Sequence, residues 1–187
     1  GKFLTFDDTP FYVYNSTVVK RIKTNFPNAK IIVILRNPID RAYSNYFLGV
    51  NGGKEKREFE EAIEEEMELI NNRNKEEIFD EKLSETYLGR GLYAEQLKVW
   101  FKEFPKDSIK IIKSENFAEK TEDVMNDLFQ FLDLPEYKIG NIEKKNVAKY
   151  TPMKKETREK LEKFFLPHNK ELYNMLGQDF GWEKSRL

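Results

Sequence analysis

The chain has 187 residues, 35% of them charged, and a formal net charge of −1 at pH 7. That length suffices for one domain with a hydrophobic core, residues 1–187, and the near-neutral balance excludes a basic field that would recruit nucleic acid. The absence of cysteine excludes disulfides, thiol catalysis and cysteine-ligated zinc. No apolar run in the sequence approaches the roughly 20 residues of a transmembrane helix, so we expect no membrane span.

The N-terminal segment combines a strand signal with a helix signal. Residues 3–6 are Phe-Leu-Thr-Phe and favour a short strand, and residues 8–10, Asp-Thr-Pro, favour a turn. Ser16 is placed to cap a helix that ends before Pro27. A turn and a capped helix are therefore expected ahead of the first long apolar run.

That apolar run opens a strand–turn–helix pattern, which is the most informative part of the sequence. The uninterrupted run Ile31–Leu35 favours a strand buried on both faces, as in a parallel sheet. Arg36 follows at the C-terminal end of the strand, Asn37 is a natural N-cap, and Pro38 suits the first helical position. Ligands of open α/β sheets bind outside the carboxyl ends of the strands, so Arg36 is placed to bind an anion. Ser44 lies about two helical turns further on and reaches the same anion only if the ligand lies beside the helix.

From chemistry alone, two interpretations of Arg36 and Ser44 stay open. In one, the planar guanidinium fork of Arg36 binds phosphate oxygens and Ser44 contacts the same anion. In the other, Arg36 pairs with an acid at the sheet edge and Ser44 faces solvent. Residues 36–44, Arg-Asn-Pro and then Arg-Ala-Tyr-Ser, resemble the 3'-phosphate-binding motif of sulfotransferases that use 3'-phosphoadenosine 5'-phosphosulfate (PAPS), most of all the glycan-type and bacterial branch. The resemblance implies that Arg36 and Ser44 bind the 3'-phosphate of that nucleotide.

The central part of the sequence predicts two further helices. Residues 54–68 are acidic, but apolar residues recur there at helical spacing, which favours a solvated amphipathic helix. The segment Arg90–Ala94 resembles the Arg-Gly-x-Tyr-Ala segment of the same family, which implies that Tyr93 lies near the nucleotide and the acceptor. Alternatively, Tyr93 is simply a core residue of the helix that ends at Pro105. The two glycines that flank Arg90 indicate unusual backbone dihedrals or the close approach of a ligand.

A second strand signal completes the evidence for the fold class. Residues 108–113 form this signal, and Thr121 is placed to cap a helix after it. Strands separated by helical patterns are typical of an α/β fold with a parallel sheet. The resemblance implies the finer architecture, which is a three-layer parallel sheet flanked by helices, of the P-loop nucleoside-triphosphate-hydrolase-like (sulfotransferase) type.

Residues 142–153 indicate a loop rich in lysine. From composition alone, it is either a solvated connector or a mobile basic loop that closes over an anionic nucleotide. The family has a Gly- and Lys-rich loop here that covers the 3'-phosphate, and Lys149-Tyr150 and Pro152-Met153 match its Lys-Tyr-Pro-x-Met portion. The family's Lys-Gly-Arg is replaced, although backbone amides can still bind phosphate. The resemblance therefore implies nucleotide contacts from Asn146, Val147, Ala148, Lys149 and Tyr150.

The C-terminal segment contains the single histidine, His168. Residues 156–165 are expected to form a helix closed by Pro167, and His168 is expected to begin a second helical stretch that ends at Gly177. His168 as a catalytic base is one interpretation, but a helix-start histidine far in sequence from any motif favours a structural role. A single histidine also argues against a histidine metal cluster and a Ser-His triad, so we expect no metal.

The catalytic residues that the resemblance implies do not occur in the sequence. Sulfotransferases carry a Lys-x-Gly-Thr-type loop that binds the 5'-phosphosulfate through backbone amides, together with an acidic base for the acceptor. We therefore expect the catalytic lysine and the acidic base upstream of Gly1, and a sulfotransferase fold that is incomplete at its N-terminus.

The resemblance implies an enzyme that moves a sulfuryl group from PAPS, its co-substrate, to a hydroxyl or amine acceptor, either a small molecule or a glycan. The alternative is a non-catalytic module that binds 3'-phosphoadenosine nucleotides. A phosphoryl-transfer kinase of related fold ranks last, because Gly-x-x-x-x-Gly-Lys-Ser/Thr is absent from the sequence. We expect a cytoplasmic protein, with a lumenal domain of a longer chain as the alternative.

Overall fold

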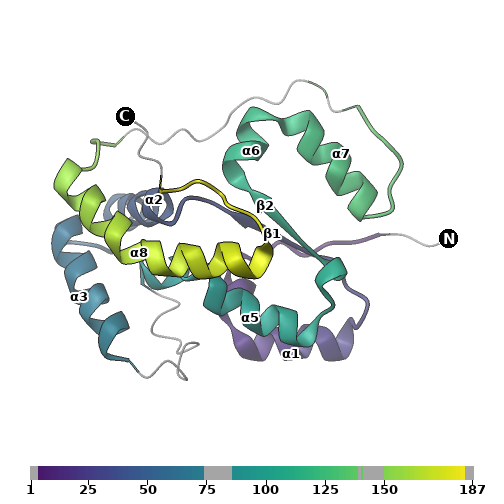
Figure 1. The fold of residues 1–187 in the computed structure, drawn as a ribbon, viewed down its shortest axis with the longest axis horizontal. Helices are drawn as coiled ribbons and strands as arrows, with labels where there is room; N and C mark the ends of the chain where they lie inside the picture. Colours follow the sequence, from purple (N-terminus) through teal and green to yellow (C-terminus); the bar gives the residue numbers. More distant parts are fainter. Residues whose placement is uncertain (1–3, 74–85, 139, 141–149, 184–187) are drawn as a thin grey trace.

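The computed structural model describes residues 4–73, 86–138, 140 and 150–183. In this part of the chain the sheet has two strands, β1 (Ile31–Leu35) and β2 (Ile109–Lys113). The strands pair in parallel, with Ile31 opposite Ile109 and Leu35 opposite Lys113 (Figure 1). Parallel pairing of strands that are separated by helices confirms the predicted α/β class.

Helices surround the two strands. Their bounds are α1 (Ser16–Asn25), α2 (Pro38–Asn51), α3 (Phe59–Asn72), α5 (Tyr93–Glu103), α6 (Ser114–Glu119), α7 (Thr121–Phe131) and α8 (Lys155–Leu176), with 3-10 turns η1 (Pro10–Tyr14), η3 (Gly89–Gly91) and η4 (Lys106–Ser108). In Figure 1, α1 and α5 lie below the strands, and α6 and α7 lie above them. None of the helices in the described ranges is long and apolar enough to cross a membrane.

One core lies between β1 and the helices α1, α5 and α8. Val33 and Leu35 are buried in it together with Val19, Tyr93, Leu97, Trp100, Phe104, Leu172, Phe180 and Trp182. Ile32 and Ile34 point to the opposite face of β1 and are 40% and 56% exposed. The expectation that this strand is buried on both faces is therefore wrong for the described residues. Successive strand residues alternate between the two faces, and the described elements cover only one of them.

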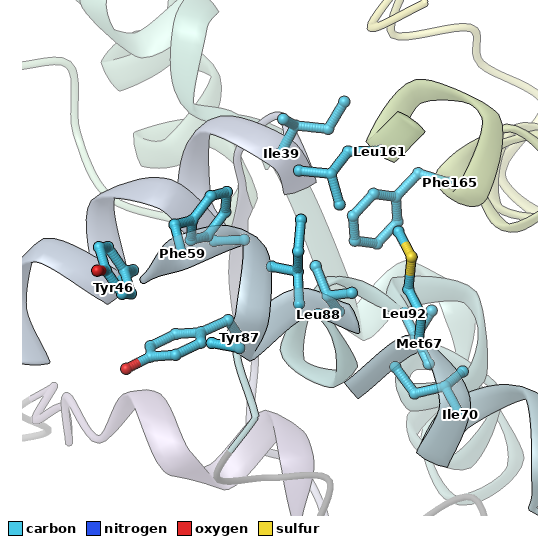
Figure 2. Close-up of a cluster of buried hydrophobic side chains, with 13 residues drawn as sticks. Ile39, Tyr46, Phe59, Met67, Ile70, Tyr87, Leu88, Leu92, Leu161 and Phe165 are labelled. Carbon is cyan, nitrogen blue, oxygen red and sulfur yellow. The ribbon is translucent and has the colours of Figure 1, made fainter. Parts of the chain in front are cut away.

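A second core joins α2, α3, α8 and the segment that leads into α5 (Figure 2). Leu88 and Leu161 are fully buried at its centre. Glu66 on α3 reaches into this core, where its carboxylate accepts hydrogen bonds from the backbone N–H groups of Tyr87 and Leu88, both at 2.7 Å. Burial raises the pKa of the Glu66 carboxyl. The segment before α5 is therefore held to α3 by apolar packing and by a buried carboxylate.

Helix α8 runs without a break from Lys155 to Leu176, so the predicted helix end at Pro167 is wrong. A proline inside a helix costs about 3 kcal/mol, because a backbone hydrogen bond is lost and the ring crowds the preceding turn. Leu161, Phe165 and Leu172 flank Pro167 and are at most 1% exposed. Each such buried side chain contributes about 1.5–3 kcal/mol, so packing outweighs the cost of the proline. The predicted end of this helix at Gly177 is confirmed, since this residue caps it with a left-handed backbone at φ 67°.

The N-terminal expectations need small corrections. No strand forms over the described residues 4–6, where Phe6 is 91% exposed and so has little packing to order it. The N-cap of α1 is Asn15, one residue before the expected Ser16, and its side chain accepts hydrogen bonds from two backbone N–H groups of the first turn. The N-cap of α7 is likewise Lys120, one residue before the expected Thr121.

Candidate functional site

A pocket of about 260 Å³ lies at the carboxyl end of β1. It is lined by Arg36, Asp40, Tyr43, Tyr150, Pro152, Met153 and Arg158. These residues come from the strand end, from the first turns of α2 and α8, and from the segment that precedes α8. The pocket therefore occupies the edge of the parallel sheet at which ligands of α/β folds bind.

Arg36 contributes a cation to this pocket. Its side chain is exposed, and it forms no hydrogen bond or ion pair with any other described residue. Asn37 caps α2 as predicted, since its side-chain oxygen accepts from the N–H groups of Ile39 at 2.9 Å and Asp40 at 3.3 Å. The guanidinium of Arg36 therefore keeps its full set of donors for a ligand beside the helix start.

The backbone around Arg36 is fixed by hydrogen bonds from three parts of the fold. The hydroxyl of Tyr93 on α5 donates to the carbonyl of Arg36 at 2.9 Å. The N–H of Asn37 donates to the carboxylate of Glu115 on α6 at 2.9 Å, and its side-chain amide donates to the carbonyl of Trp182 at 3.3 Å. These contacts orient Arg36 through its peptide groups.

Tyr93 itself is a core residue, only 5% exposed, and burial raises its pKa to about 12. Its neutral hydroxyl is therefore a permanent donor to the carbonyl of Arg36, beside the pocket and outside its lining. A direct contact of Tyr93 with a nucleotide remains a prediction. Ser44 is half-buried on α2, one turn beyond Asp40, and is not among the pocket-lining residues.

Asp40 and Arg158 form an ion pair inside the pocket. Arg158 Nη2 lies 2.6 Å from Asp40 Oδ1, and the two side chains are 35% and 37% exposed. The pair joins the first turn of α2 to the first turn of α8. The pocket therefore contains a second guanidinium besides that of Arg36, and one carboxylate.

Aromatic side chains form one wall of the pocket. The ring of Tyr150 stacks on Phe47 with a centroid separation of 4.9 Å, and it meets the ring of Tyr43 edge-on at 5.4 Å. The hydroxyl of Tyr43 donates to the carbonyl of Thr151 at 2.9 Å. Tyr150 is thus held in the same pocket as Arg36, beside α2. The other predicted loop contacts lie outside the described residues: Asn146, Val147, Ala148 and Lys149.

The turn η3 packs behind the pocket. A Cβ built on Gly91 would lie 2.9 Å from Cε1 of Phe165 and 2.9 Å from Cβ of Pro38. Gly91 has no positive φ, so unusual backbone dihedrals do not account for a glycine here. The close approach of two protein side chains, Phe165 and Pro38, does. Arg90 donates to Asn45 Oδ1 at 3.1 Å, which ties this turn to α2.

His168 lies outside the pocket, within α8. Its Nδ1 is 3.9 Å from Glu95 Oε1, and Glu95 pairs with Arg73 at 2.6 Å. The Arg73–Glu95 ion pair is buried, and these contacts join the C-terminal end of α3 to α5 and α8, which favours the structural role of His168. Among the described residues, no group of three or more carboxylate or histidine side chains is arranged to hold a metal ion.

Comparison with known proteins identifies the family. The model of the family described as "Sulfotransferase domain" matches residues 15–187. This chain belongs to the sulfotransferase domain family. Its sequence is 26% identical to membrane-associated sulfotransferase kil1 of Dictyostelium discoideum, over 94% of the chain and 52% of the relative. It is 29% identical to carbohydrate sulfotransferase 15 of Homo sapiens, over 84% of the chain and 32% of the relative.

A solved structure agrees with this assignment. The crystal structure of a sulfotransferase from Alicyclobacillus acidocaldarius superposes with a TM-score of 0.76, at 28% sequence identity, over 94% of this chain and 65% of the other. The fold is therefore that of a sulfotransferase. The sulfotransferase domain described here spans about half the length, or less, of the two curated relatives.

Of the residues that line the pocket of this sulfotransferase domain, the sequence predicts only Arg36 and Tyr150 as site residues, and the charged residues that it does not predict are Asp40 and Arg158. Asp40 has an ordinary role in the first turn of a helix, where a carboxylate favours the dipole. Arg158 lies in a charged helical segment with no motif. Their contact joins positions 118 residues apart, and a single sequence has no signal for such a pairing.

Proposed function

We propose that this domain binds PAPS and that the whole protein transfers its sulfuryl group to a hydroxyl or amine acceptor. The observation that carries the proposal is Arg36, a guanidinium held at the end of β1 with its donors directed to no other described residue. The planar fork of an arginine matches the oxygens of a phosphate group. The 3'-phosphate is the group assigned to this pocket, with Ser44 and the segment that ends at Tyr150 as further contacts.

In the proposed reaction, an acceptor oxygen or nitrogen attacks the sulfur of PAPS in line. The bond between sulfur and the bridging oxygen of the 5'-phosphate breaks, and 3'-phosphoadenosine 5'-phosphate leaves as the acceptor loses its proton to a base. The described residues hold the 3' end of the nucleotide, which fixes the position of the reacting sulfur relative to the acceptor. We assign the lysine and the acidic base of the reaction to none of them.

The proposed acceptor is a glycan, and a small molecule is the alternative. Support comes from the names of the relatives, which include carbohydrate sulfotransferase 15 and a heparan sulfate glucosamine 3-O-sulfotransferase of Mus musculus. We also infer that β1 and β2 belong to the three-layer, P-loop-like sheet that the sequence resemblance implies.

Two measurements on the full-length protein test this function. Calorimetry is expected to show tighter binding of 3'-phosphoadenosine 5'-phosphate than of adenosine 5'-monophosphate, and equal affinities would contradict a 3'-phosphate site. Labelled PAPS is then offered with a panel of glycans, phenols and amines, and transfer of label to at least one acceptor is expected. Selective binding without any transfer would favour the non-catalytic nucleotide-binding module.

A further inference from the structure

The pocket holds a second arginine, and the geometry assigns it a role that the sequence motif does not include. We propose that Arg158 is a second phosphate-binding side chain, and that Asp40 weakens anion binding by adding a like charge. This inference rests on the proposed function, because it names further residues of the same pocket. It follows from three features of the pocket: the start of α8 is held in place, the guanidinium of Arg158 has donors that no described residue uses, and the carboxylate of Asp40 lines the same cavity as the two guanidinium groups.

Arg158 is carried by a helical turn that the fold holds in place. Its neighbour Thr157 is 5% exposed and donates through its hydroxyl to Glu60 Oε1 on α3 at 2.7 Å. One turn further, Leu161 is fully buried, and Lys160 Nζ lies 2.6 Å from Glu64 Oε1. The start of α8 is therefore bound to α3, and Arg158 projects into the pocket from an anchored position.

The guanidinium of Arg158 keeps donors for a ligand. Only its Nη2 atom is paired, with Asp40 Oδ1 at 2.6 Å, and its Nε and Nη1 atoms form no hydrogen bond with another described residue. Arg36 reaches the same pocket from the end of β1. Two guanidinium groups from separate elements thus line one cavity, an arrangement suited to a phosphate monoester, which carries up to two negative charges.

Asp40 opposes the binding of such an anion. Its carboxylate lines the same pocket and cancels one of the two positive charges. An asparagine at this position would keep an oxygen that accepts from Arg158 Nη2 and would remove the negative charge. Because the orientation of Arg158 is then preserved, the only change is the loss of a negative charge from the pocket. Anion binding should therefore become stronger. A purely structural ion pair makes a different prediction, since losing either partner would then have the same effect.

The test compares R158Q, D40N and the control K155Q in the full-length protein. Lys155 lies in the same first turn of α8, is 84% exposed and does not line the pocket, so K155Q makes the same change of charge nearby. Calorimetry measures the affinity of each variant for 3'-phosphoadenosine 5'-phosphate and for adenosine 5'-monophosphate. Thermal unfolding without nucleotide checks that each variant folds, and R158K replaces R158Q if the latter does not.

R158Q is expected to weaken binding of the 3'-phosphorylated nucleotide by roughly 10- to 100-fold, which is the effect of losing a charge-assisted contact. The affinity of R158Q for adenosine 5'-monophosphate should stay within about twofold of that of the unmodified protein. R158K keeps the positive charge but lacks the planar guanidinium, so it should lose less affinity for the 3'-phosphorylated nucleotide than R158Q. D40N is expected to tighten binding of the 3'-phosphorylated nucleotide by about threefold or more, because one like charge is gone. K155Q should change neither affinity by more than about twofold.

The outcomes separate this inference from the function on which it rests. If the unmodified protein binds both nucleotides equally, the 3'-phosphate site itself is wrong. If it prefers the 3'-phosphorylated nucleotide and R158Q behaves like K155Q, the role of Arg158 is overturned while the proposed function stands. Weakened binding in D40N would overturn the opposing role of Asp40, and opposite effects of R158Q and D40N would support both assignments.

Discussion

Gly91→Ala is expected to destabilise the domain, because the added methyl group has no room behind the pocket. A Cβ at this position would lie 2.9 Å from both Cε1 of Phe165 and Cβ of Pro38. Both neighbours are under 2% exposed, so neither side chain has free space to move into. Overpacking costs about 1–3 kcal/mol, against a gain of about 0.4–1 kcal/mol from the lower entropy of the unfolded alanine variant. We expect a net loss of roughly 1–2 kcal/mol in the free energy of unfolding.

Urea unfolding followed by tryptophan fluorescence measures this loss, since Trp100 and Trp182 are 3% and 6% exposed and report on the core. Gly140→Ala is the matched control, because a Cβ there meets no atom of the described residues within 4 Å. Pro38 begins the helix that follows Arg36, so Gly91→Ala should also weaken binding of 3'-phosphoadenosine 5'-phosphate. A free energy of unfolding equal to or above that of the unmodified protein would refute the packing argument.

Three further predictions concern the pocket, its support and an ion pair between α2 and α3. Arg36→Gln should weaken binding of 3'-phosphoadenosine 5'-phosphate in calorimetry by roughly 10- to 100-fold, and Ser44→Ala should weaken it by less, because charge-assisted hydrogen bonds are about twice as strong as neutral ones. A larger loss in Ser44→Ala than in Arg36→Gln would show that Arg36 is not the main anchor. Tyr93→Phe removes the 2.9 Å hydrogen bond to the Arg36 carbonyl and should lower the free energy of unfolding in urea by about 1 kcal/mol, and an unchanged value would show that this bond contributes nothing. Hydrogen bonds from Arg57 lower the pKa of Glu55 from 4.5 to about 2, so the Glu55 carboxylate stabilises the fold above pH 4.5 and loses this effect as the pH falls toward 2. The stability difference between the unmodified protein and Glu55→Gln in urea should therefore shrink over that interval, and a difference that is independent of pH would contradict the assignment.

The parts of the site that were predictable are local in sequence. The apolar run before Arg36, the Asn37 cap and the Pro38 helix start act within a few residues of one another, and each has its own physical signature. These signals are sufficient to place a guanidinium at the end of a parallel strand without any tertiary contact. The end of α8 at Gly177 was predictable for the same reason, since a left-handed glycine cap depends on the chain next to it.

The parts that were missed depend on tertiary contacts. The continuity of α8 through Pro167 results from side chains packed against α2, α3 and α5, which local rules for proline do not include. The pairing of Asp40 with Arg158 joins two helix starts that are brought together only by the fold. The exposure of Ile34 likewise depends on which faces of β1 the described helices cover, and an apolar sequence alone does not indicate this.

The hydrogen bonds that hold the turn at Arg36 have a consequence for the order of folding. Asn37 donates to Trp182, which lies 145 residues further along the chain, and to Glu115, which lies 78 residues away. During synthesis, the strand and helix that carry Arg36 leave the ribosome long before these acceptors exist. The pocket therefore reaches its final geometry only after Trp182 has emerged and packed. Contacts of such long sequence separation slow folding, because a large loop must close before they form.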